Sequence, residues 1–472
     1  MAPAKTPLTK SQLLGLGAMS MGVLVIANDF TALSVALPHI ERDFKSDVTT
    51  VQWIINGYAL VFGVLIVTGG RLADMFGRRR IFFLGAAIFA VFSLAGGLAP
   101  DVWVLLASRG LMGIGGAMMW PAILGMTYGL LPQSRAAIAG ALVLGSAGFG
   151  NAIGPLIGGA LTDLLSWRWI FYLNLPVAAF AVLVTWWVVP AEEPDETDRR
   201  IDYGGVVTVS IALFALLLAL DLGTGIGWTD PTIVTLFTVA ALGLIVFAFI
   251  ERHAGTKALI PDDVLANRAF FAAFLATLMS SAIFFAGLIY LPQFMSKVLG
   301  FNAIESGAGL LPVMGVFALT SFVAGPLYER FGAKAIVSTG AAFLATGMFM
   351  LSRIEPTTTF TELIPGMAVL GMGIGMFYSS ITTAAITCLD KARASLGGAI
   401  IYMAEIAGGS IGLGFNTAIV VSATNLADGI GTAFLVNSAL AVCALTVSLF
   451  FIGGRIDRAT LHSLVHRHRA HG

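Results

Sequence analysis

Three ionisable side chains lie inside apolar stretches of this chain, and their chemistry is the first thing to explain. Asp29 stands within VLVIANDFTALSVALP, Arg109 within the apolar run 102–131, and Glu405 within the run 395–423. Ionisable groups in such an environment are costly, and they commonly carry protons, pair with a substrate or pair with each other. These three residues are therefore the leading candidates for a functional site.

The elements that must position them are apolar helices. The chain has 472 residues, of which 57% are hydrophobic and 11% charged, whereas soluble domains average about 25% charged. Fourteen apolar runs are long enough to cross a bilayer, the first over 12–37 and the last over 431–453. They are not ten-residue alternating segments, so a membrane β-barrel is excluded. The sequence predicts an all-α polytopic membrane protein.

The basic residues predict its orientation. If both termini are cytoplasmic, about four in five of the 26 Lys and Arg residues fall on the cytoplasmic side. An even number of spans is required for that arrangement. The first apolar run is too long for a signal-peptide core, so we expect it to be retained as a helix. The four histidines of the last segment, HSLVHRHRAHG, are interpreted as part of a basic cytoplasmic tail, and we predict no metal site.

An internal repeat predicts the domain organisation. GGRLADMFGRRR (69–80) resembles AGPLYERFGAK (324–334), and Pro38 matches Pro292 at nearly the same spacing. Parallel six-helix repeats with a cavity between them are a known transporter plan. The predicted units are an N-terminal six-helix bundle, a cytoplasmic linker with two inserted helices, a C-terminal six-helix bundle and a cytoplasmic tail, over 1–190, 191–265, 266–455 and 456–472. The inserted pair is interpreted as a spacer, a lipid-facing brace or a lateral entry route.

Several motifs together resemble the major facilitator superfamily, and within it the fourteen-helix drug:H⁺ antiporters. The loop after the second span, the Arg109-x-x-x-Gly113 pattern, GNAIGPLIGG (150–159) and NDFTALSVALP (28–38) are similar to family motifs. WRWIFYLNLP (167–176) and QWIINGYAL (52–60) resemble two further landmarks. The chain departs from the pattern at Met112, where glutamine is usual, and at Ser34, where asparagine is common. The resemblance implies the major facilitator fold, with two six-helix bundles plus an inserted helix pair.

The resemblance also implies a function. It predicts a proton-coupled exporter (antiporter) of lipophilic, cationic drugs by alternating access, driven by the proton gradient and without a cofactor. The alternative is a dedicated exporter of an endogenous lipid, siderophore or secondary metabolite by the same mechanism. An enzyme is disfavoured, because the sequence has no nucleotide-binding loop, no HExxH pair and no sizeable soluble domain. We expect small lipophilic substrates, protons and the lipid bilayer as partners, no nucleic acid, a monomer, and a bacterial inner (plasma) membrane location.

Two glycine-containing segments are predicted to serve conformational change. The loop after the second span is interpreted as a latch on the cytoplasmic side, in which Asp74 accepts hydrogen bonds from a helix N-terminus or an arginine. The alternative is that its arginines only anchor the topology. Its residues are Gly70, Asp74, Gly77, Arg78 and Arg79. The antiporter motif, which comprises Gly150, Gly154, Pro155, Gly158 and Gly159, presents a smooth helix face for close packing or gating. GGSIGLG (408–414) supplies a similar face.

The roles of the embedded charges stay open between stated alternatives. Asp29 and Arg109 fall at similar depth in the outer half of the membrane, and the family fold brings their helices together. Asp29 is interpreted as a proton-coupling site whose proton affinity changes as it moves relative to Arg109, or as one partner of a fixed ion pair. Glu405 lies near the midplane, where the family often has arginine. It is interpreted as a second proton site, a partner for a cationic substrate, or a neutral hydrogen-bonded acid.

Aromatic residues and a methionine complete the predicted site. Adaptable aromatic and thioether surfaces suit varied lipophilic ligands. The candidates for the substrate cavity are Trp53, Tyr58, Trp120, Phe284, Tyr290, Phe377, Tyr378, Tyr402 and Met403.

Overall fold

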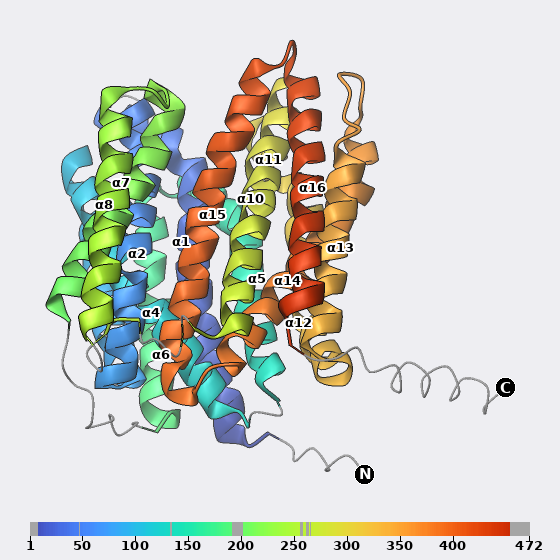
Figure 1. The fold of residues 1–472 in the computed structure, drawn as a ribbon. Helices are drawn as coiled ribbons and strands as arrows, with labels where there is room; N and C mark the ends of the chain where they lie inside the picture. Colours follow the sequence, from blue (N-terminus) through green and yellow to red (C-terminus); the bar gives the residue numbers. More distant parts are fainter. Residues whose placement is uncertain are drawn as a thin grey trace.

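The computed structural model describes residues 8–46, 48–132, 135–190, 202–254, 258–260, 264 and 266–453. Within these ranges the regular structure is helical and no strand is formed. The helices, labelled as in Figure 1, are α1 (Lys10–Phe44), α2 (Val48–Phe76), α3 (Arg78–Gly97), α4 (Val102–Leu130), α5 (Ala136–Leu164), α6 (Arg168–Val188), α7 (Tyr203–Ile226), α8 (Pro231–Ala254), α10 (Arg268–Lys297), α11 (Ala303–Ala308), α12 (Leu311–Phe331), α13 (Ala333–Leu351), α14 (Phe360–Thr387), α15 (Ala394–Ser422) and α16 (Leu426–Phe451). A short 3-10 turn, η4 (Lys391–Arg393), precedes α15.

In the described part of the chain, 14 helical stretches are long and apolar enough to cross a membrane. This confirms the prediction of an all-α chain with fourteen spans. α1 begins and α16 ends at the lower face in Figure 1, which we call the inner face; the opposite face is the outer face. The inner face is the one that the sequence predicts to be cytoplasmic. Residues 191–201 of the predicted linker and the predicted tail 456–472 lie outside the described residues.

The first helix is longer than the sequence predicts. The apolar run ends at about residue 37, but α1 continues through Pro38 to the outer face. There Asp43 accepts hydrogen bonds from Trp167 Nε1 at 3.0 Å and from Arg168 Nη1 at 2.7 Å. These contacts hold the polar end of α1 against the start of α6, so the helix extends beyond its apolar part.

The helices pack into two six-helix bundles and an inserted pair. In the first bundle, α1 packs on α4, α5 and α6, α2 on α4, and α3 on α4 and α6. In the second, α10 packs on α15 and α16, α12 on α14, and α13 on α14 and α16. α7 packs on α8 and contacts α2 and α15. The bundles meet along two seams: α2 and α4 against α15, and α5 against α12 and α14.

One backbone feature recurs in both bundles. Gly77 ends α2 and starts α3 with φ 97°, and Gly332 ends α12 and starts α13 with φ 85°. Both lie in the region that favours glycine, because a side chain there would be strained. The two glycines are the aligned positions of the sequence repeat, so the same turn follows the second helix of each bundle.

Candidate functional site

Asp29 and Arg109 form a buried ion pair between α1 and α4. Both side chains have an exposed fraction of 0%. The second Asp29 carboxylate oxygen accepts a hydrogen bond from Asn174 Nδ2 of α6 at 2.9 Å, and Asn174 Nδ2 also donates to Ser93 Oγ of α3 at 3.1 Å. Arg109 Nε donates to the carbonyl of Ile54 in α2 at 2.8 Å. Side chains and backbone from α1, α2, α3, α4 and α6 therefore converge on the ion pair.

The guanidinium of Arg109 also rests on an aromatic ring. Arg109 Cζ lies 4.3 Å from the centre of the Tyr58 ring, a cation–π contact, and Tyr58 has an exposed fraction of 0%. Among the described residues, Arg109 Nη2 has no hydrogen-bond acceptor. The sequence predicted similar depth for Asp29 and Arg109, and the structure brings them together. The sequence-based prediction did not include Asn174 or Ser93, although an asparagine within the apolar run YLNLPV is a detectable signal.

A separate cavity of about 290 Å³ lies between the two bundles. Its aromatic lining comes from both of them: Trp120 from α4, Phe284 and Phe285 from α10, Phe317 from α12, Tyr378 from α14 and Tyr402 from α15. The ring centres of Trp120 and Tyr402 are 4.4 Å apart, and those of Phe284 and Tyr378 are 6.0 Å apart. We call this the central cavity. Its position between the bundles is where a transporter of this architecture holds its substrate.

Of the described residues that line the central cavity, Glu405 is the one with an acidic side chain. Its side chain is half-buried, and none of the described residues forms a hydrogen bond or an ion pair with its carboxylate. Its carboxyl group therefore faces the cavity without a protein partner among the described residues. Asp29, in contrast, does not line the cavity. Ala27 and Thr31 of α1 line the cavity. Asp29 is two residues from each of them, and two residues correspond to a turn of about 200° around the helix, so Asp29 points to nearly the opposite side.

The helical period separates the predicted cavity residues. Tyr58 faces Arg109, whereas its neighbour Ala59 lines the central cavity. Trp53 and Met403 do not line the cavity, because each is offset around its helix from the residues that do. Tyr290 lines another cavity, of about 700 Å³, at the outer ends of α10 and α15. Phe377 is fully buried against α13, with its backbone beside Gly340.

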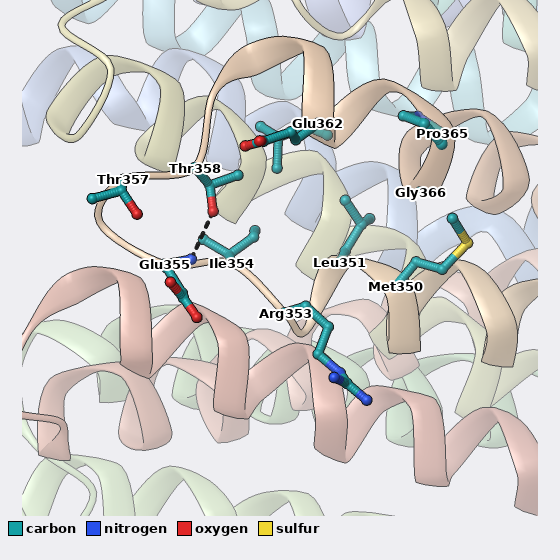
Figure 2. Close-up of a pocket in the computed structure, with 11 residues that line it drawn as sticks. Met350, Leu351, Arg353, Ile354, Glu355, Thr357, Thr358, Glu362, Pro365 and Gly366 are labelled. Atoms are coloured by element: carbon teal, nitrogen blue, oxygen red, sulfur yellow. Dashed lines mark hydrogen bonds between the residues drawn. The ribbon is translucent and has the colours of Figure 1, made fainter.

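Figure 2 shows a third cavity, of about 400 Å³, at the outer ends of α13 and α14. Arg353, Glu355 and Glu362 are among its lining residues, and Thr358 Oγ1 accepts a hydrogen bond from the backbone N–H of Glu355 at 2.9 Å. None of the predicted site residues lines it. The cavity belongs to the α13–α14 connection and lies apart from the candidate site.

At the inner face, Asp74 of α2 caps the N-terminus of α15. Its carboxylate accepts hydrogen bonds from the backbone N–H groups of Ser395 at 3.3 Å and Leu396 at 2.9 Å. The residue preceding α15, Arg393, provides no side-chain cap. The carboxylate therefore satisfies N–H groups that the helix leaves unpaired and lies at the positive end of its dipole. This contact joins one bundle to the other.

Arg78 strengthens the same contact. Its Nε donates to Asp74 Oδ1 and to Ser395 Oγ, both at 3.1 Å, and its Nη2 donates to the carbonyl of Lys391 at 2.6 Å. Gly70 allows the close approach of α2 and α15, because a Cβ there would lie 2.9 Å from the Ser395 carbonyl oxygen. Arg79 instead donates to carbonyls at the end of α6, within its own bundle. If this contact acts as the predicted latch, its residues are Gly70, Asp74 and Arg78, and Arg79 is not among them.

We expect Asp74→Asn to weaken this latch. An amide lacks the charge that the α15 N-terminus stabilises, and the loss of such a charge–dipole interaction costs about 0.3–1 kcal/mol. Spin labels at Arg80→Cys and Arg330→Cys, both exposed at the inner face, are introduced in a Cys388→Ser, Cys443→Ser background. They should show a larger fraction of long distances in the Asp74→Asn variant. Asp101→Asn is the matched control, because Asp101 caps α4 at the outer face within one bundle. Equal distance distributions in both variants would contradict a latch role.

The antiporter-motif glycines pack α5 against α1. A Cβ at Gly154 would lie 2.0 Å from Thr31 Oγ1, and a Cβ at Gly158 would lie 2.1 Å from the Ala32 carbonyl oxygen. α5 continues through Pro155 as one helix. The motif glycines therefore face α1 within one bundle, whereas Pro155 lies beside Gly307 of α11 in the other bundle, at 3.7 Å from a Cβ built there. Gly150 has the same environment, since its Cβ would meet α1 at 3.1 Å.

GGSIGLG packs α15 against α10 in the same way. A Cβ at Gly408 would lie 2.2 Å from the Leu278 carbonyl oxygen, and a Cβ at Gly412 would lie 2.2 Å from Ala282 Cβ. Close packing of these two helix pairs is thus common to both bundles. The glycine faces themselves lie within the bundles, whereas the helices that carry them, α5 and α15, also line the two seams between the bundles. The gating interpretation of these helices stays a prediction.

This packing predicts a sharp contrast between adjacent glycines. Gly158→Ala should lower the stability of the folded protein by about 1–3 kcal/mol, because the methyl group overlaps α1 backbone. Gly159→Ala is the control, because its Cβ would meet only Val35 Cγ1 at an ordinary 3.7 Å. Thermal unfolding in detergent measures both. A Gly159 variant as unstable as the Gly158 variant would disprove the packing argument.

Two six-helix bundles around a central cavity are the architecture of a known class of membrane transporters. Residues 19–413 match the family model of the Major Facilitator Superfamily, and the chain belongs to this family. Its members are transporters and not enzymes. The structure resembles that of the human organic anion transporter MFSD10, with a TM-score of 0.66 and 14% identity, over 93% of this chain and 99% of that one. This likeness confirms the predicted fold.

Curated relatives are named for drug resistance. The puromycin resistance protein of Streptomyces alboniger is 32% identical over 87% of this chain and 82% of its own length. The multidrug resistance protein Stp of Mycobacterium tuberculosis is 32% identical over 86% of this chain and 75% of its own. The methylenomycin A resistance protein of Bacillus subtilis is 30% identical over 92% of this chain and 93% of its own length. These names support a drug exporter, and the bacterial relatives of a fourteen-span chain support a bacterial inner membrane.

Proposed function

We propose that this chain is a proton-coupled antiporter that exports lipophilic, cationic drugs by alternating access. One arrangement carries the proposal: Glu405 lines an aromatic cavity between the bundles, while a separate buried ion pair, Asp29–Arg109, lies on the far side of α1. The residue proposed to bind the substrate, Glu405, and the residue proposed to bind the proton, Asp29, are then separate in one transporter. The drug-resistance names of the relatives support export.

The cavity chemistry favours a particular substrate class. Aromatic faces such as those of Trp120 and Tyr402 bind flat apolar molecules and attract cations. The unpaired carboxylate of Glu405 adds a net attraction for positive charge in a site of low dielectric constant. A volume of about 290 Å³ is at the lower end of small-molecule sites. A small aromatic cation such as ethidium fits this description.

Proton coupling is assigned to the Asp29–Arg109 pair. Protonation of Asp29 removes its charge and weakens its attraction to Arg109, so the bundle can rearrange around α1 and α4. The latch at Asp74 holds the inner face closed in one state and releases in the other. The proton gradient supplies the energy, so no cofactor is required. We propose a monomer in a bacterial inner membrane with both termini cytoplasmic.

The proposal is tested by dye transport in inside-out vesicles. An imposed acidic interior should drive accumulation of ethidium, and collapse of the pH gradient by nigericin should release it. Vesicles without the protein are the control. If folded protein moves no dye under any pH gradient, multidrug export is refuted and a dedicated exporter of an endogenous lipid, siderophore or secondary metabolite becomes the better account.

A further inference from the structure

The inserted pair α7–α8 stands beside one of the two seams between the bundles (Figure 1). α7 contacts α2 of the first bundle and α15 of the second, and α2 and α15 also contact each other. α8 covers the other side of α7 and exposes large apolar side chains, including Leu242, Ile245 and Phe249. α7 therefore lies between the α2–α15 seam and a surface suited to lipid.

At mid-height this seam is filled by side chains. Ile55 and Ala59 of α2 line the central cavity, and Gly63 follows one turn later on the same face. A Cβ at Gly63 would lie 3.1 Å from Leu217 Cδ1 of α7 and 3.3 Å from Ile406 Cγ2 of α15. Ile406 itself lines the cavity. The space left by the missing Gly63 side chain is thus occupied by Leu217 from outside and Ile406 from inside.

The other seam is filled by larger side chains at the same height. Between α5 and α12, a Cβ at Gly148 would lie 2.9 Å from Phe317 Cε1, and a Cβ at Gly145 would lie 2.7 Å from Phe322 Cζ. Both seams have close backbone contacts at their inner ends, at Gly70 in one and at Gly140 in the other. At Gly63 the closing side chains are two aliphatic ones, and one of them, Leu217, comes from the inserted pair.

The α7–α8 hairpin is attached near both of its ends. At the outer face Trp228, in the connection between α7 and α8, packs on α15: a Cβ at Gly414 would lie 2.6 Å from the Trp228 ring. At the inner end of α8, the buried carboxylate of Glu251 accepts hydrogen bonds from the backbone N–H groups of Leu259 at 2.9 Å and Ile260 at 3.2 Å. The middle of α7, which carries Leu217, lies between these two attachment points.

We propose that lipophilic substrates enter the central cavity from the bilayer through the α2–α15 seam at Gly63, and that Leu217 of α7 closes this route. The inference rests on the proposed export of lipophilic drugs, which dissolve in the bilayer before they are bound. It gives the inserted pair a specific role, a lateral cover, in place of the spacer or brace alternatives. Leu217 then selects substrates by their access from the lipid phase.

The route is tested without transport by lipid quenching. A bimane label on Ile406→Cys, in a Cys388→Ser, Cys443→Ser background, reports contact with brominated acyl chains in nanodiscs. Leu217→Ala should at least double the quenching. Ile211→Ala is the matched control, because Ile211 is 51% exposed on α7 whereas Leu217 is 6% exposed. Quenching that is unchanged by Leu217→Ala, or raised equally by both substitutions, overturns the proposal.

Transport provides the second readout. Leu217→Trp should lower export of a bisbenzimide dye that partitions into the bilayer by about fivefold or more, while export of ethidium, which partitions less, changes by less than about twofold. Equal losses for both dyes would show that α7 is a brace, and no loss for either would show that Leu217 closes nothing. If the native chain exports neither dye but the quenching result holds, the export function fails and the lateral route stands.

Discussion

Asp29→Asn is expected to abolish uphill export of ethidium while downhill movement of the dye continues. Asparagine resembles the protonated carboxyl in shape and neutrality but binds no proton, so the pH gradient loses its point of coupling. The surrounding contacts are expected to persist, because Arg109 still has the Ile54 carbonyl and Asn174 still has Ser93. Uphill and downhill transport in vesicles measure the two effects separately.

In either role, the substitution leaves Arg109 without its buried counter-ion. Removing one partner of a buried ion pair costs about 3–5 kcal/mol, because the remaining charge is uncompensated. Thermal unfolding of the variant therefore has to be measured beside transport. Asp43→Asn is the matched control. Asp43 lies on the same helix as Asp29 and pairs with Arg168 of α6, but its side chain is 49% exposed. Normal uphill export by Asp29→Asn would place the coupling elsewhere.

Glu405→Gln is expected to weaken ethidium binding by about tenfold or more, which corresponds to about 1.4 kcal/mol. The substitution removes the carboxylate that faces the cavity and leaves the aromatic rings in place. A neutral lipophilic substrate should bind as before, and Glu405→Asp should retain most of the cation binding. Fluorescence titration of purified protein with both ligands measures these affinities directly.

The same titration distinguishes two of the interpretations of Glu405. If cation and neutral affinities are both unchanged but ΔpH-driven export falls, Glu405 is a second proton site and not a cation partner. If binding of both ligands falls equally, the substitution disturbs the cavity itself. Only a selective loss of cation binding supports the assignment made above.

The fold could be predicted in detail because apolar length and basic-residue bias carry strong signals. The repeat of GRLADMFG as GPLYERFG predicted two related bundles, and the positive φ of Gly77 and Gly332 gives a physical reason for part of that match. Helix ends were less predictable. α1 extends past Pro38 because Asp43 contacts α6, and such a tertiary contact leaves no mark in local hydrophobicity.

The site was predicted unevenly, for reasons of helical geometry. Rare intramembrane charges such as Asp29 and Arg109 are visible in any apolar run, whereas a neutral amide such as Asn174, their partner, gives a weaker signal. Aromatic residues have no such signal. Tyr58 and Ala59 are adjacent in sequence, yet only the second reaches the cavity, because each step along a helix turns the side chain by about 100°.

The central claim is that substrate and protons move in opposite directions through one protein. The most direct test uses proteoliposomes with trapped pyranine and the membrane potential clamped by valinomycin and potassium. Ethidium added outside enters down its gradient, and the account predicts that protons leave, so the interior becomes more alkaline; Asp29→Asn should carry ethidium without this pH change. If the native protein moves ethidium and the internal pH stays constant, the chain is not a proton antiporter.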